Sequence, residues 1–163
     1  MNIHSAGTAL IGLQPVGIDT FQSIVLGKTI VAISEDAVAA VKKSQAVMDQ
    51  AIDQGRRIYG INTGFGALGH KATDSSELNQ LQQNLIYHLA TGVGEPFSWE
   101  NARALCAARL IVLARGASGC PIAVIGTLCE VLNAGLAPVV PSKGTVGASG
   151  DLTPSAHMTL ALL

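Results

Sequence analysis

Stretches of apolar residues at helical spacing alternate with glycines and prolines along this chain, and that alternation limits the folds it can adopt. Ser34 is a residue type that caps helix N-termini, acidic residues follow it, and Gly55 is a residue type that ends helices. Together they predict a helix over residues 35–54. A short β-branched run at residues 29–33 predicts a strand. Further helices are expected from the cap region 74–76 to Gly92, from Ser98 to Gly116, from Pro121 as first residue to residues 133–135, and from Pro154 to Leu163. The sequence therefore predicts a mainly α-helical fold with short strands and glycine-rich loops.

Charge and hydropathy exclude several classes of protein. Lys and Arg number 10 and Asp and Glu 11, and the resulting net charge of -1 argues against a nucleic-acid interface. Hydrophobic residues make up 48% of the chain and charged residues 13%, which excludes a disordered protein. No apolar run approaches the roughly 18 residues that a membrane helix needs. We expect a folded protein that binds neither nucleic acid nor membranes.

The cysteines and histidines do not suggest a metal site. Cys106, Cys120 and Cys129 are odd in number and lack the C-x-x-C spacing of zinc and redox sites. The four histidines show no metal-ligand spacing either. Residues 1–20 lack the basic and apolar regions of a signal peptide. The spacing of the cysteines and histidines therefore predicts no bound metal. Free thiols and the lack of a signal peptide predict a cytoplasmic protein.

The glycine-rich loop at residues 144–152 could modify itself chemically. If the Gly150 nitrogen attacks the Ala148 carbonyl and Ser149 loses its hydroxyl, two waters leave and a methylidene-imidazolone (MIO) forms. The attacking residue must be glycine because a Cβ would obstruct its nitrogen. The product is an electrophile made without an external cofactor, which ordinary side chains cannot supply. Such a triplet by itself also fits an inert turn.

Three separated segments give the triplet its context. Val-Gly-Ala-Ser-Gly-Asp-Leu-Thr-Pro at 146–154, Tyr-Gly-Ile-Asn-Thr-Gly-Phe-Gly at 59–66 and Leu-Gln-Gln-Asn-Leu-Ile-Tyr-His-Leu at 81–89 resemble the aromatic amino acid ammonia-lyase family. That family comprises histidine, phenylalanine and tyrosine ammonia-lyases and related aminomutases. The resemblance runs from about Ile30 to Leu163 and implies the N-terminal, MIO-forming domain of a fumarase/aspartase-like helical fold.

The resemblance also implies a role for individual residues. Ala148, Ser149 and Gly150 match the triplet that forms the electrophile, on which the substrate amine becomes a better leaving group. Tyr59 matches the catalytic base that removes a β-proton before ammonia departs. The pKa of a free tyrosine is about 10, so a base at neutral pH requires hydrogen-bond donors or positive charge that lower it.

A second pair of positions concerns the choice of substrate. His88 and Leu89 match the family's substrate-sorting pair, and His-Leu resembles the tyrosine-preferring version, in which the imidazole binds the phenol hydroxyl. His88 falls on an apolar helical stripe, where it needs a partner; a core histidine bonded to a backbone carbonyl is the alternative. Gly66 and Leu152 match positions that line the substrate's aromatic ring.

Family members are several times longer than this chain, and their active sites are assembled from three subunits of a homotetramer. Because the resemblance begins near Ile30, we expect an N-terminal arm over residues 1–29 and a domain over 30–163. The last helix, ending at Leu163, has no cap, which predicts that this domain is cut at the start of a central helical bundle. One hypothesis is a catabolic ammonia-lyase that converts L-tyrosine to coumarate, with histidine or phenylalanine deamination or a 2,3-aminomutase activity as variants. The other is a non-catalytic helical fragment that assembles with a partner; the piece alone is expected to be inactive.

One competing motif points to a different ligand. Gly64–Gly69 satisfies G-x-G-x-x-G, the pattern of a dinucleotide-binding turn. However, no carboxylate for a ribose stands about 20 residues further on, and no alternating strand and helix pattern surrounds the motif. Nucleotide binding is therefore not expected.

Overall fold

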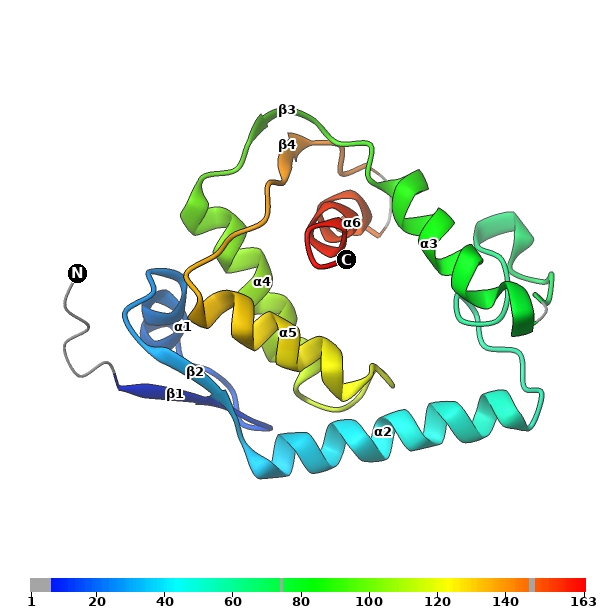
Figure 1. Ribbon diagram of the computed structural model, residues 1–163, viewed down its shortest axis with the longest axis horizontal. Coiled ribbons are helices and arrows are strands. Elements are labelled where there is room, and N and C mark those ends of the chain that lie inside the picture. Colours follow the sequence, from blue (N-terminus) through cyan, green and yellow to red (C-terminus); the bar gives the residue numbers. More distant parts are fainter. Residues whose placement is uncertain (1–6, 74, 147–148) are drawn as a thin grey trace. The chain divides into compact units, whose positions relative to one another are not determined.

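The computed structural model describes residues 7–73, 75–146 and 149–163, and its chain divides into two compact units. Unit 1 combines Met1–Val47 with Phe97–Val139, and unit 2 combines Met48–Pro96 with Val140–Leu163. Six α-helices and four short strands occur in the described ranges, which confirms the mainly helical fold (Figure 1).

Unit 1 joins a two-stranded parallel sheet to helices. β1 (Thr8–Ile11) pairs with β2 (Ile30–Ile33), and α1 (Ile18–Val25) lies between them in the sequence. α2 (Glu35–Asp53) begins here, α1 packs on α4 (Trp99–Leu113), and α4 packs on α5 (Ile122–Asn133), which also contacts β2. The apolar core of the unit includes Ile11, Ile24, Val31, Val41, Cys106, Leu110, Ile125 and Leu128.

Unit 2 contains the loop with Tyr59 and the segment with Ser149, next to two helices. Two 3₁₀ turns, η1 (Gly66–Leu68) and η2 (Ser75–Glu77), precede α3 (Leu78–Leu89). β3 (Val93–Pro96) and β4 (Pro141–Lys143) then lie side by side as an antiparallel pair (Figure 1). α6 (Leu152–Leu160) packs against α3.

The observed ends of the helices confirm some expected capping residues and correct others. The Ser98 hydroxyl accepts a hydrogen bond from the Asn101 N–H at 3.3 Å, as expected of a cap. Pro121 is the N-cap of α5 and not its first residue, because its ψ of 143° is extended. α6 begins at Leu152, so Pro154 lies in its first turn, where the missing N–H has no helical partner to lose. β1 and α1 were not predicted, since four and eight residues give a weak periodic signal.

One buried arginine holds the helix ends of unit 1 together. Arg103 is 1% exposed, and its guanidinium donates to four backbone carbonyl groups in the last turn of α1 and at or just beyond the end of α5. The acceptors are the carbonyl oxygens of Val25 at 2.8 Å, Ile24 at 2.8 Å, Leu132 at 3.0 Å and Leu136 at 3.2 Å. Burial lowers the pKa of Arg103 and raises the pKa of the nearby Cys106 thiol, and their mutual attraction opposes both shifts. The guanidinium keeps its proton, because arginine does not deprotonate in proteins.

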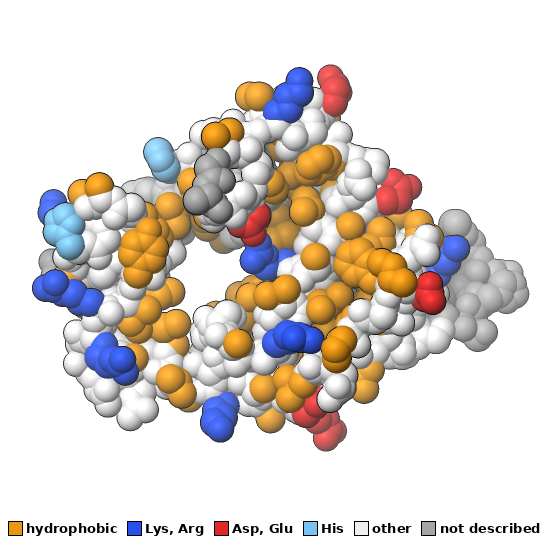
Figure 2. All heavy atoms as spheres, turned by 180° about the vertical axis from the view of Figure 1, so that it is seen from behind, with side chains coloured by type: hydrophobic (Ala, Val, Ile, Leu, Met, Phe, Trp, Pro, Cys, Tyr) orange, Lys and Arg blue, Asp and Glu red, His pale blue; other side chains and the backbone are white. Residues whose placement is uncertain are grey.

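Across the described ranges, no helix is both long and apolar enough to cross a membrane. On the face shown in Figure 2, the Lys and Arg side chains of the described residues are spread out, whereas hydrophobic side chains adjoin one another over large areas. This distribution gives no support to a nucleic-acid interface on that face.

Replacing Arg103 by lysine tests how much the carbonyl contacts stabilise unit 1. Arg103→Lys keeps the charge but cannot reproduce the forked set of donors, so we expect the free energy of unfolding to fall by about 2 kcal/mol. Urea denaturation followed by circular dichroism measures the change. Arg115→Lys, at an exposed position that follows α4, is the matched control and should be close to neutral. Equal stability of the two variants would contradict the assigned role of Arg103.

Candidate active site

Unit 2 contains every predicted site residue that the structure describes. These are Tyr59, Gly66, His88, Leu89, Ser149, Gly150 and Leu152. Ala148, the remaining member of the predicted triplet, lies outside the described residues. The geometry below therefore belongs to one compact unit.

Tyr59 lies in the loop between α2 and η1 with its side chain 66% exposed. Its phenol oxygen accepts a hydrogen bond from the Gly66 N–H at 2.9 Å, and its ring meets Phe65 edge-on, with ring centres 6.3 Å apart. A Cβ on Gly69 would lie 2.8 Å from the Tyr59 ring, so the close packing there needs glycine. Two positions that the sequence suggested for separate roles, Tyr59 and Gly66, are thus in direct contact. The Gly66 N–H therefore holds the phenol oxygen of Tyr59 in place.

Asn62 fixes the start of this loop. Its side-chain oxygen accepts a hydrogen bond from the Ile58 N–H at 2.8 Å, and its amide nitrogen donates to the Arg56 carbonyl at 2.8 Å. One side chain therefore satisfies backbone groups on the segment leading into Tyr59.

Thr63 fixes the middle of the loop from inside. The side chain is 1% exposed, and its hydroxyl accepts from the Gly60 N–H at 3.2 Å and donates to the Gly64 carbonyl at 2.9 Å. Gly60 has a φ of +76°, a conformation that side-chain-bearing residues rarely adopt. The backbone at Gly60 and at Gly64 is consequently held by one buried hydroxyl.

The end of α3 presents the two predicted substrate-sorting residues. His88 is exposed and Leu89 is partly buried. Among the residues that the structure describes, no hydrogen bond reaches the His88 imidazole, so the alternative of a core histidine bonded to a carbonyl is wrong. α3 contains no fully buried residue, and the leucines on the same stripe as His88 are partly buried.

The structure describes two of the three predicted triplet positions, Ser149 and Gly150, in the segment before α6. Gly150 has a φ of +79°, and Ser149 beside it is exposed. Leu152, the first residue of α6, is 48% exposed. The glycine-only conformation at Gly150 and the accessible Ser149 fit the residues from which an MIO group would form.

Two contacts join this segment to the end of α3. A Cβ on Gly144 would lie 3.0 Å from the Gly92 Cα, so the two glycines allow a close backbone approach. His157 of α6 accepts a hydrogen bond from the Gly92 N–H at 3.0 Å through its Nε2 atom. The chain that follows the His88–Leu89 pair is therefore tied to the helix that begins at Leu152.

The glycine motif at residues 64–69 does not form a dinucleotide-binding turn. It leads into the three-residue η1, and Thr63 before it forms only an isolated bridge with Ala72. A strand, a tight turn and a long helix are what the dinucleotide motif requires. Within the described ranges no group of three His, Cys, Asp or Glu side chains could hold a metal ion.

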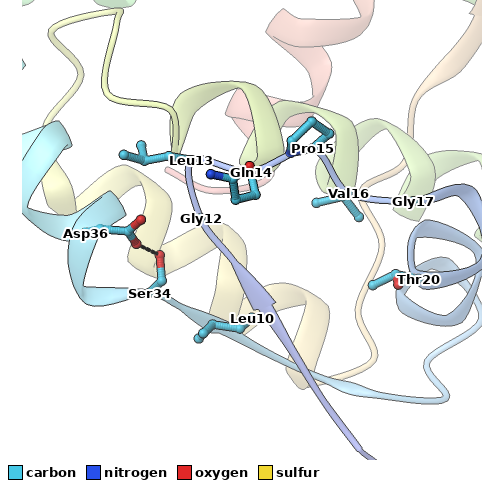
Figure 3. Close-up of a pocket in the computed structure, with 10 residues that line it drawn as sticks. All are labelled: Leu10, Gly12, Leu13, Gln14, Pro15, Val16, Gly17, Thr20, Ser34 and Asp36. Carbon is cyan, nitrogen blue, oxygen red and sulfur yellow. Dashed lines mark hydrogen bonds between the residues drawn. The ribbon is translucent and has the colours of Figure 1, made fainter.

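The cavity drawn in Figure 3 lies in unit 1 and is lined by none of the predicted site residues. It has a volume of about 280 Å³ and is lined by Leu10, the Gly12–Gly17 segment, Thr20, Ser34 and Asp36. The Ser34 hydroxyl donates to the Asp36 carboxylate at its edge, as Figure 3 shows. This pair belongs to the start of α2, where it caps the helix: both side chains accept from the Ala37 N–H.

Sequence reasoning missed the roles of four side chains that bind backbone groups in unit 2, namely Asn62, Thr63, Gln82 and His157. Asn62 and Thr63 are polar residues in a glycine-rich segment, and this could have identified them, because a polar side chain in such a place usually satisfies backbone groups. Gln82 lies among other polar residues of its helix, so its sequence surroundings give no such signal.

The fold of the chain is similar to that of a solved enzyme structure. The structure of tyrosine aminomutase from Streptomyces globisporus superposes with a TM-score of 0.84 at 29% identity, over 92% of this chain and 28% of that one. Residues 16–163 match the profile of the aromatic amino acid lyases. This chain belongs to the aromatic amino acid lyase family.

Two curated relatives show the range within the family. The tyrosine ammonia-lyase of Cereibacter sphaeroides is 42% identical over 90% of this chain, and the histidine ammonia-lyase of Geobacillus thermodenitrificans is 49% identical over 82%. The aligned parts are 28% and 26% of those proteins, so the chain spans about a quarter of the length of these relatives.

The buried hydroxyl of Thr63 provides a test of the loop geometry. Thr63→Val keeps the shape of the side chain but leaves the Gly60 N–H and the Gly64 carbonyl without this partner. We expect local opening to become easier by about 1–2 kcal/mol, so that amides of residues 58–69 exchange roughly 5–30 times faster. Hydrogen-exchange mass spectrometry of the full-length protein measures this. Thr127→Val in α5 is the control, and unchanged exchange in Thr63→Val would contradict the assignment.

Proposed function

We propose that the full-length protein is an ammonia-lyase that acts on an aromatic amino acid, with L-tyrosine as the preferred substrate and coumarate and ammonia as products. The observation that carries the proposal is the hydrogen bond from the Gly66 N–H to the Tyr59 phenol oxygen. In this assignment Tyr59 removes a proton from the substrate Cβ, and the Cα–N bond breaks as ammonia leaves. The amide donor supports the proposal because it fixes the position of the phenol oxygen that would take the proton.

The triplet Ala148, Ser149 and Gly150 is the proposed source of an MIO group. When formed, that group supplies an electrophile for the substrate amine. The support from this chain is the φ of +79° at Gly150 and the exposure of Ser149. No external cofactor is part of the proposal.

His88 and Leu89 are the proposed determinants of the substrate. An exposed imidazole without a hydrogen bond among the described residues is free to bind a phenol hydroxyl, while Gly66 and Leu152 would line the ring. A site built for a hydroxyl discriminates strongly, because a substrate without it leaves a polar group without a partner. The tyrosine ammonia-lyase relative supports this choice, and the histidine ammonia-lyase relative supports the alternative of histidine deamination.

Two further alternatives have their own support. A 2,3-aminomutase activity is supported by the similarity to tyrosine aminomutase, since such an enzyme would use the same base and electrophile. For the 163-residue chain by itself, a non-catalytic assembly module is supported by exposed apolar side chains such as Tyr87, Val93 and Leu152. A homotetramer in the cytoplasm completes the proposal for the full-length protein, following the resemblance noted above.

Mass and product together test the proposal. The purified full-length protein should weigh two waters less than its sequence, and the deficit should map to the peptide with Ala148–Gly150 and vanish in Ser149→Ala. Incubation with L-tyrosine should release ammonia and an ultraviolet-absorbing coumarate. Tyr59→Phe should keep the mass deficit but lower the rate by about 10²–10⁴-fold. An unmodified mass, or no product from folded protein with tyrosine, phenylalanine or histidine, would refute the proposed function.

Substrate preference is tested at His88. His88→Phe removes the proposed partner of the phenol hydroxyl, so the ratio of kcat/KM for tyrosine to that for phenylalanine should fall at least about tenfold. Steady-state kinetics with both amino acids measure the ratio. Tyr87→Phe, at the exposed neighbouring position, serves as the control. An unchanged ratio in His88→Phe would remove His88 from substrate choice.

A further inference from the structure

Gln82 joins α3 to the loop between α2 and η1 that contains Tyr59, here called the Tyr59 loop. Its side-chain nitrogen donates to the Gly60 carbonyl at 3.0 Å and to the Ile61 carbonyl at 3.2 Å. A glutamine amide carries two N–H groups, so these two bonds use both of its donors. Gln82 is partly buried in α3, whereas Gln83 beside it is exposed.

The two carbonyls are those that follow Tyr59 in the chain. Gly60 is held on both sides: its N–H donates to the Thr63 hydroxyl, and its carbonyl accepts from Gln82. The remaining bonds described for this loop run between its own residues, such as Asn62 with Ile58. The contacts from Gln82 therefore set where the whole loop lies relative to α3.

α3 also ends with the His88–Leu89 pair. His88 follows Gln82 by six positions, which corresponds to about 9 Å along a helix that rises about 1.5 Å per residue. Because a helix is stiff over that length, fixing the loop to Gln82 fixes the Tyr59 backbone relative to His88. A small displacement of a reacting group is enough to cost up to about 10²-fold in rate.

We propose that Gln82 is a positioning residue that holds the Tyr59 loop at a set distance from the substrate-sorting end of α3. This inference rests on the proposed function, in which Tyr59 is the base and His88 contacts the substrate. Gln82 touches neither the substrate nor the reacting atoms in this assignment. It acts through the backbone of Gly60 and Ile61.

Gln82→Glu is the sharpest test, because it keeps the shape of the side chain, removes both donors and places carboxylate oxygens against two carbonyls. Gln82→Met removes the donors without adding charge. In the full-length protein we expect both variants to lower kcat for tyrosine about 10–100-fold, with KM within about twofold. The mass deficit of two waters and the tyrosine-to-phenylalanine preference should stay unchanged. The deuterium isotope effect at the substrate Cβ should rise, since removal of the proton becomes slower.

Gln83→Glu and Gln83→Met are the matched controls, with the same changes one residue away on an exposed position. A loss of folded protein would lower the apparent rate but could not raise the isotope effect. Gln82 variants with the kinetics of the Gln83 variants, or a lower kcat with an unchanged isotope effect, would overturn the proposal.

A structural readout separates this inference from the proposed function. If the wild-type protein releases no ammonia from any aromatic amino acid, the proposed function fails. Hydrogen exchange then still tests the contact: faster exchange at residues 58–69 in Gln82→Glu than in Gln83→Glu supports the role of Gln82 in holding the loop. Equal exchange in the two variants would overturn it.

Discussion

Backbone carbonyl and amide groups at the ends of helices and in turns have no partner within their own element, and satisfying them is the constraint on which both units depend. Unit 1 meets it with one buried cation, Arg103, whose guanidinium reaches the final turn of α1 and the end of α5. Unit 2 meets it with neutral side chains, among them Asn62, Thr63 and Gln82. Only 13% of the residues of the chain are charged, and these hydrogen bonds around the proposed site come from uncharged side chains.

Periodicity and capping residues were sufficient to predict the main helices and one strand. Ser34, Ser98 and the glycines that end helices carry local information that does not depend on the rest of the fold. β1, β3 and β4 were missed because these short strands are stabilised by pairing with residues far away in the sequence. α1 was missed because its eight residues carry a weak periodic signal. The position of Pro121 was off by one residue, since N-cap and first-turn positions both accept a proline φ near −62°.

The candidate site was predictable as a set of residue types but not as an arrangement. The motifs around Tyr59, His88 and Ser149 suggested the chemistry, and family membership is shown independently by residues 16–163. The contact between Tyr59 and Gly66, the exposure of His88 and the tie from His157 to Gly92 depend on how distant segments pack. No spacing rule encodes these contacts, because each joins a side chain to a backbone group whose place is set by the fold.

Gln82 recognises only backbone oxygens, and this has a consequence for how the family could diversify. A clamp that reads carbonyl groups does not depend on the side chain at Ile61, and it does not touch His88 or Leu89. Substitutions at His88 and Leu89, the proposed substrate-sorting positions, leave the two hydrogen bonds that place the loop unaltered. In an enzyme built this way, altering the substrate and preserving the reaction geometry are separate problems. A designer could address the first by varying the end of α3 while leaving the frame around Gly60 as it is.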